Sequence, residues 1–280
     1  MAEPTTARAV SAASASPPPG GEGLGAGGPR PKRQALILQP SPPPHPSPTE
    51  GGGGRRSFGG GDATGEVSDQ LHVPALDRLR LTQILSPAFP IGAFAHSQGL
   101  EWAIASGRIR NEADLQHWIA AIITDGSGKS DAIFVSLARR DGADLSALAQ
   151  LYDAYLPAAG RGVEAAELGR GFQTLTDPTA TPLPYVLALG RETACLAVPE
   201  AEVLALFLQS LAAQLISVAV RFLPLGQTAG QRVLAALAPV IADTAHRCTG
   251  AGTEALTSFT PGADIAAMAH ATMETRIFRT

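Results

Sequence analysis

The sequence predicts an all-α protein, a single-domain bundle of about nine or ten helices preceded by a disordered tail. From Leu76 onward, alanine and leucine alternate with charges spaced three and four residues apart, which is typical of amphipathic helices. No stretch shows the strict period-2 alternation of a half-buried strand. Residues 1–73 are dominated by proline, glycine, serine and alanine, and such a segment buries too little apolar surface to offset the entropy of ordering it. We therefore expect a disordered tail at 1–73 and one all-helical domain at 74–280.

The predicted helices follow from caps and breakers along the chain. A first helix at 76–85 ends before Pro87, because proline cannot continue the backbone hydrogen-bond ladder. Asn111 can cap a helix that runs to about residue 124. Its buried face is then formed by Leu115, Trp118, Ile119 and Ile122. Further helices are expected at 128–140, 143–156, 160–175, 184–196, 200–222, 228–248 and 262–275.

Residues 203–220 approach the apolar length that crosses a membrane. Four polar residues interrupt the segment, and charged residues stand at both ends, with Glu200 and Glu202 before it and Arg221 after it. Apolar residues still occur around most of the helix. We therefore interpret it as the central helix of the bundle, buried on all sides, and predict no membrane insertion.

Composition and cysteine spacing limit the class of protein. The net charge is −4, so no overall basic field exists to attract nucleic acid or an anionic membrane surface. Cys195 and Cys248 lie far apart, without the spacing of a zinc knuckle or a disulfide framework. The first residues contain no apolar core of a secretory signal. A cytoplasmic protein fits these observations.

The segment GSGKS at 126–130 resembles the end of a phosphate-binding P-loop, which opens the alternative of a small nucleotide hydrolase. The full motif requires a glycine at position 123, but Ile123 stands there, and a helix rather than a strand precedes it. We therefore favour a turn between two helices, with Lys129 in solvent.

No catalytic or metal-binding pattern is found elsewhere. The six histidines form no metal-ligand motif, and His246 and Cys248 point to different faces of a helix, although a metal site shared with a second chain stays open. Glu164 and Glu167 lie beside arginines, and we interpret them as a solvated charged face rather than as a general acid and base. The sequence therefore predicts no enzyme, no cofactor and no metal.

Three segments do not fit ordinary helix connections. They read SPAFPIGAFAHSQGLE at 86–101, RFLPLGQTAGQ at 221–231, and DIAAMAH followed by TRIFRT at 264–280. Each combines turn residues with aromatic or polar side chains that are costly to bury and unusual to expose. In this order, the three segments resemble three signature blocks of the urease accessory protein UreF family. This chain departs from the family pattern at His96, where tyrosine is frequent, at Ala271, where glutamate is usual, and at Thr280, where serine is usual.

The resemblance implies an all-helical, dimeric, cytoplasmic scaffold that does not itself hydrolyse nucleotide. Its implied partners are UreD (also called UreH), the GTPase UreG and apo-urease, and the assembly would couple GTP hydrolysis to nickel insertion. A generic helical adaptor unrelated to urease is the other alternative. The residues that the motifs assign to partner interfaces are His96, Glu101, Arg221, Gln227, Gln231, His270, Arg276, Phe278 and Arg279. The C-terminal arginines and Phe278 lead this set, because arginine and aromatic residues are frequent energetic anchors of interfaces.

Overall fold

The structure is a computed structural model that describes the backbone of residues 64–280 and the side chains from Val73 onward. This part of the chain is all-helical, as predicted, and contains no strand. The disordered tail predicted at 1–73 falls mostly on residues 1–63, which lie outside the described residues. The elements are α1 (Thr64–Ile84), η1 (Ala93–Ala95), α2 (Leu100–Ala105), α3 (Glu112–Asp125), α4 (Ser127–Ala138), α5 (Leu145–Tyr155), α6 (Ala159–Thr176), α7 (Tyr185–Thr193), α8 (Glu200–Phe222), α9 (Gly226–Cys248), η2 (Thr253–Ala255) and α10 (Pro261–His270).

Most predicted helices are found within a few residues of their expected bounds. The predicted cap of α3 is confirmed: the side-chain oxygen of Asn111 accepts a hydrogen bond from the backbone N–H of Asp114 at 2.9 Å. Leu115, Ile119 and Ile122 are buried on the predicted face of this helix, whereas Trp118 is only half-buried. Strong periodicity together with a local cap therefore locates a helix well.

Three elements differ from the prediction. Helix α1 begins at Thr64, earlier than predicted, and contains Pro74. Residues 1–63 are rich in glycine and proline, but residues 64–73 contain one glycine and no proline. Helix α2 was not expected in the proline-rich connection. Helix α10 ends at His270 rather than at 275, because the chain then turns back toward α2.

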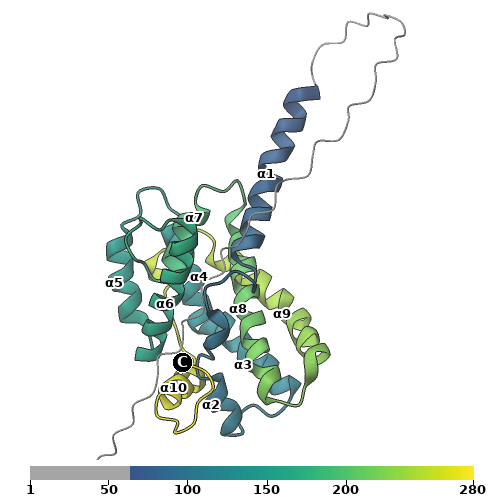
Figure 1. Cartoon of the computed structure of the whole chain (residues 1–280), viewed down its shortest axis with the longest axis vertical. Helices are drawn as coiled ribbons and strands as arrows, with labels where there is room; N and C mark the ends of the chain where they lie inside the picture. Colours follow the sequence, from purple (N-terminus) through teal and green to yellow (C-terminus); the bar gives the residue numbers. More distant parts are fainter. Residues whose placement is uncertain (1–63) are drawn as a thin grey trace, which may run out of the picture. The chain divides into compact units, whose positions relative to one another are not determined.

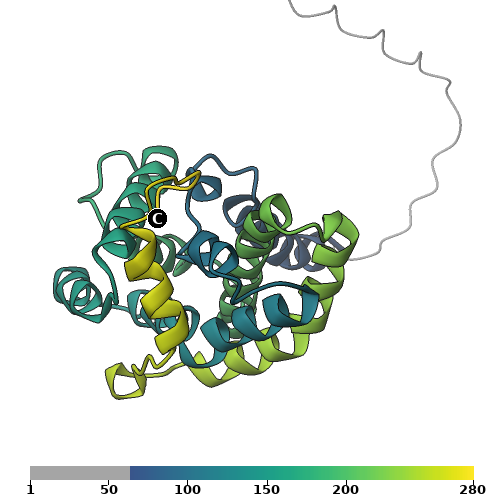
Figure 2. The same ribbon diagram turned by 90° about the horizontal axis from the view of Figure 1, so that it is seen from below.

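The helices pack around α8, which contacts α9, α2, α3 and α4 (Figure 1). Helix α9 lies antiparallel and close to α8 because Gly230 faces it: a Cβ atom there would lie 2.9 Å from Cγ2 of Ile216. Seen from below, α10 lies beside α2 (Figure 2). The hydrophobic core between these helices includes the fully buried Phe134, Phe172 and Ile119.

The prediction that α8 is buried on all sides is partly wrong. Within the described residues α8 is the one helix long and apolar enough to cross a membrane, but 56% of its most apolar stretch is buried inside this protein. A core helix passes the same test of length and composition. Gln209 and Ser217 are exposed, so one strip of α8 reaches the surface. Ser217 and the partly exposed Ser210 and Gln214 form a strip of α8 that lines a cavity described below.

The GSGKS segment forms the turn between α3 and α4 and then the first turn of α4. Gly128 is buried, and a Cβ atom there would lie 2.9 Å from the carbonyl oxygen of Ile122. The chain before it is helical, whereas a P-loop follows a strand. Lys129 is half-buried rather than fully in solvent, and its Nζ donates to Oγ1 of Thr257 at 2.7 Å. This geometry opposes the nucleotide-hydrolase alternative.

The two cysteines are not bonded to each other: Cys195 is exposed and Cys248 is buried. His246 is exposed, so it faces away from Cys248 as expected. Among the described residues, no group of three or more histidine, cysteine, aspartate or glutamate side chains could hold a metal ion.

Candidate functional site

The C-terminal segment, residues 271–280, binds back onto the connection between α1 and α2. The backbone N–H of Arg279 donates to the carbonyl oxygen of Ala95 at 2.8 Å. The N–H groups of Ser97 and Gln98 both donate to the carbonyl oxygen of Thr280, at 2.6 and 3.1 Å. Two of the three unusual segments, which lie about 180 residues apart in sequence, are therefore paired through backbone atoms.

A left-handed turn at Gln98 and Gly99 gives the connection this shape. Their φ angles are 54° and 80°, a region that glycine adopts without strain and other residues seldom adopt. Gly99 is also required by packing, because a Cβ atom there would overlap the backbone of Ala267 in α10. The turn points successive N–H groups of Ser97 and Gln98 to the same side, where they meet the carbonyl of Thr280.

Glu101 is the buried acceptor that fixes the C-terminal segment. Its carboxylate accepts hydrogen bonds from Nε2 of His270 at 2.8 Å and from the backbone N–H groups of Ile277 and Phe278 at 2.8 and 3.1 Å. Burial by itself would raise the pKa of Glu101, but these three hydrogen bonds to the charged form outweigh it and hold the pKa below its usual value. Glu101 therefore stays ionised while the segment is bound.

His96 lies on the other side of the same segment and is buried. Its Nδ1 lies 2.9 Å from Oγ1 of Thr280, and its Nε2 lies 3.7 Å from Oε2 of Glu167. Burial lowers the pKa of His96, although the carboxylates of Glu164 and Glu167 act in the opposite direction. This environment favours a neutral imidazole that shares a hydrogen bond with the hydroxyl of Thr280.

Phe278 anchors the segment in the core of its own chain, with 3% of its surface exposed. Its ring centroid lies 5.6 Å from that of Phe222 at the end of α8, and the guanidinium of Arg221 lies 5.7 Å above the ring. The beginning of the segment at 221–231 is thereby joined to the C-terminal segment.

Four exposed side chains, three of them arginines, lie in this segment or beside its Phe278. We call them the tail surface: Arg221, Arg276, Ile277 and Arg279. Ile277 is 74% exposed and lies between Arg276 and the buried Phe278. Arg279 binds the carboxylate of Glu167 at 2.8 Å. Of the predicted interface residues, His96, Glu101, His270 and Phe278 are enclosed in the chain, whereas the three arginines reach solvent.

Gln227 and Gln231 are not part of the tail surface. Both are exposed in the first turns of α9, where they line a cavity together with Gln214 of α8. The structure therefore divides the predicted residues into two places.

The interpretation of Glu164 and Glu167 as a solvated face is wrong for Glu164. Only 1% of Glu164 is exposed, and its carboxylate accepts from Nη1 of Arg161 at 2.6 Å. Nη2 of Arg161 lies 3.3 Å from Oδ2 of Asp131, and burial raises the pKa of Asp131 to about 6. The sequence showed the i, i+3 pair of Arg161 and Glu164 but not the α4 residue that closes over it. Glu164 also accepts from Oγ1 of Thr280 at 3.2 Å, so this cluster is joined to the C-terminal segment.

Sequence reasoning did not assign a role to several residues that hold the segment. They are Ser97, Gln98, Glu164, Glu167 and Thr280. Ser97, Gln98 and Thr280 lay inside the quoted segments, but their pairing depends on contacts across more than 180 residues, which no local pattern reveals.

Comparison with known proteins gives a consistent result. A sequence model described as UreF matches residues 109–238. A protein named "Urease accessory protein UreF" from Cereibacter sphaeroides strain ATCC 17029 is 49% identical over 206 residues, which cover 72% of this chain and 98% of that protein. Proteins of the same name from Paracoccus denitrificans and Rhodopseudomonas palustris strain BisA53 are 47% and 41% identical, covering 74% and 71% of this chain and 97% and 92% of their own lengths.

Proposed function

This chain belongs to the UreF family of urease accessory proteins, and from that premise we propose that it is a non-catalytic scaffold that presents its C-terminal segment to the other urease accessory proteins. Family membership supports a role in urease maturation and argues against the unrelated-adaptor alternative. The proposed partners are UreD (UreH), the GTPase UreG and apo-urease, the proposed process is nickel insertion, and the proposed location is the cytoplasm.

The observation that carries this proposal is the tail surface. Glu101 and the backbone of residues 95–98 hold residues 277–280 in place, so their outward side chains are oriented before any partner arrives. A preorganised segment loses less conformational entropy on binding than a free one. An exposed aliphatic residue between arginines combines the apolar and charged contacts that interfaces use.

The buried predicted residues act as positioning residues in this proposal. His96, Glu101 and His270 hold the segment from within, while Arg221, Arg276 and Arg279 make the partner contacts.

We also propose that the chain forms a homodimer. The apolar face of α1, with exposed Val73, Leu76 and Leu79, supports that proposal.

The test replaces Ile277 with aspartate and measures capture of purified UreD and UreG by the full chain. Because Ile277 is 74% exposed, the variant should fold normally. Capture should fall at least about tenfold, since a side chain that the partner would bury becomes charged. A urease activation assay with added nickel and GTP should lose activity in parallel.

The matched control is Phe259→Asp, which changes an apolar side chain that is 80% exposed and precedes α10. It should leave capture unchanged. Capture by Ile277→Asp at the level of the unmodified chain would remove the tail surface from the proposal, and equal loss in both variants would point to a general effect of added charge.

A further inference from the structure

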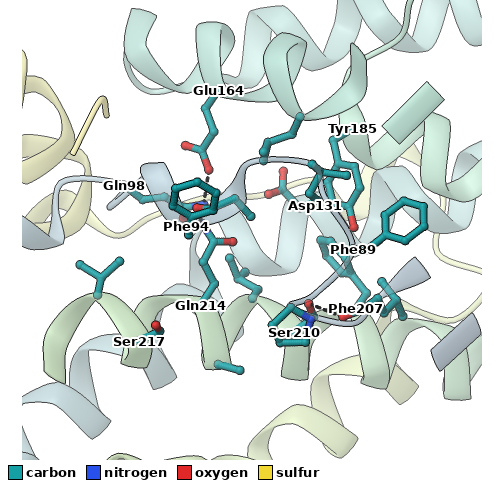
Figure 3. Close-up of a pocket in the computed structure, with 18 of the residues that line it drawn as sticks. Phe89, Phe94, Gln98, Asp131, Glu164, Tyr185, Phe207, Ser210, Gln214 and Ser217 are labelled. Carbon is teal, nitrogen blue, oxygen red and sulfur yellow. Dashed lines mark hydrogen bonds between the residues drawn. The ribbon is translucent and has the colours of Figure 1, made fainter. Parts of the chain in front are cut away.

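A cavity of about 320 Å³ lies between α8 on one side and α6 and α7 on the other. Its α8 wall is the partly exposed strip of Ser210, Gln214 and Ser217 noted above, and Phe94 stands at its mouth with 69% of its surface exposed (Figure 3). The apolar walls include three aromatic rings, those of Phe89, Tyr185 and Phe207. Volume and lining are those of a small-molecule site.

The inner end of this cavity is polar and buried. Gln98, Asp131, Arg161 and Glu164 line it, and none exposes more than 8% of its surface. In Figure 3, Gln98 and Glu164 are joined by a hydrogen bond, with Asp131 nearby. The aromatic walls and this polar end give the cavity two chemically different parts.

Two atoms at the polar end have no hydrogen-bond partner among residues 73–280: Oε1 of Gln98 and Nε of Arg161. The orientation of the Gln98 amide is fixed, because its Nε2 donates to Oε1 of Glu164 at 2.9 Å, which leaves Oε1 as the available acceptor. Nη1 and Nη2 of Arg161 donate to Glu164 and Asp131, whereas its Nε–H has no acceptor among the described residues. Buried polar atoms of this kind cost free energy unless something pairs with them.

The pair of available atoms defines the head group that fits. A ligand must donate to Gln98 and accept from Arg161, which an uncharged carboxamide or hydroxyl does. A carboxylate cannot donate, and it would add a third negative charge beside Asp131 and Glu164, which share one guanidinium. An ammonium cannot accept from Arg161. The aromatic walls require an apolar body.

We propose that this cavity binds a small uncharged amphiphile, with its amide or hydroxyl head against Gln98 and Arg161 and its apolar body against Phe89, Tyr185 and Phe207. The proposal goes beyond the scaffold role and does not depend on it. It does suggest a physical link between the two places, because Glu164 and Gln98 form the polar end of the cavity and also bind Thr280.

The test is isothermal titration calorimetry of the full chain with hexanamide, hexanoate and hexylammonium at neutral pH. Hexanamide should bind at least about tenfold more tightly than either charged probe, because only its head satisfies both buried atoms. Two variants locate the binding: Ala213→Trp fills the cavity from α8 and should abolish it, and Gln98→Met removes both amide atoms at similar length and should weaken hexanamide selectively.

The matched control is Ala242→Trp, which adds the same side chain on the exposed face of α9 and should bind hexanamide normally. Circular dichroism shows whether each variant is folded. If Ala213→Trp does not fold, the affinity of Gln98→Met for hexanamide shows whether binding occurs in this cavity. Equal affinity for the amide and the carboxylate, binding that persists in both cavity variants, or no binding of any probe would overturn the proposal.

Discussion

At the scale of single residues, buried polar side chains hold the C-terminal segment in place. The buried carboxylate of Glu101 accepts three hydrogen bonds. Two of the donors are backbone N–H groups of the C-terminal segment. Its ionisation is therefore coupled to the binding of that segment.

Replacing Glu101 with glutamine should lower the free energy of unfolding by about 1–3 kcal/mol at neutral pH, because an amide turns a donor toward N–H groups that need an acceptor. The pKa of Glu101 is lowered in the folded chain, so its stabilisation is present above the pKa of the unfolded state and is lost as the pH falls through the folded value. Urea denaturation at several pH values should show the two proteins converging in acid.

Glu112→Gln is the control for this pH dependence. Glu112 also has a lowered pKa, through its ion pair with Arg232, but the pair is exposed to solvent. Exposed pairs contribute little, so this variant should stay close to the unmodified chain at every pH. A pH-independent difference for Glu101→Gln would show that its carboxylate charge is not what holds the segment.

At the scale of elements, close approach between helices depends on glycines at their contacts. Gly169 of α6 faces the start of α7, where a Cβ atom would overlap the carbonyl oxygen of Leu183 and lie 3.0 Å from the backbone nitrogen of Tyr185. Backbone atoms cannot move aside as a flexible side chain can.

Gly169→Ala should therefore lower the free energy of unfolding by about 1–3 kcal/mol, measured by urea denaturation. The same substitution at Gly162, two turns earlier in α6, meets only Cδ1 of Leu156 at 3.4 Å. That variant should be stabilised by up to about 1 kcal/mol, because alanine is the better helix former. The same sign of change at both positions would contradict the packing argument.

The sequence predicted elements well where periodicity and a local cap agree, as in α3, and less well where tertiary contacts decide. The end of α10 is an example, because residues 271–275 carry no strong breaker, yet the chain leaves the helix to supply N–H groups to Glu101. Helix α2 is another, since it follows a left-handed turn whose shape depends on contact with α10.

At the scale of the whole molecule, the C-terminal segment closes the bundle. Deleting residues 276–280 removes no helix, so far-ultraviolet circular dichroism should stay nearly unchanged. It does remove the partner of Phe222 and two donors to Glu101, so the melting temperature should fall by several degrees. Capture of UreD and UreG should be lost, and a truncated chain that still captured both would contradict the proposed role of the segment.

The candidate site could be predicted from sequence only as three separate segments. The motifs named His96, Glu101, His270 and Phe278, and the structure brings these four together. The sequence could not show which predicted residues are buried and which are exposed arginines, because local sequence does not reveal whether a polar side chain faces the core or solvent. The burial of Glu164 in α6 was missed because its i, i+3 pairing with Arg161 is also typical of an exposed helix face.

The way in which the C-terminal segment is held has a consequence for how its sequence can change. Glu101, Ala95, Ser97 and Gln98 bind the backbone of residues 277–280, not their side chains. New side chains at 277 and 279 leave those bonds intact, whereas an insertion or deletion between His270 and Phe278 moves every donor away from its acceptor. For folding alone, positions 277 and 279 should therefore accept other side chains, whereas the number of residues between His270 and Phe278 should not change.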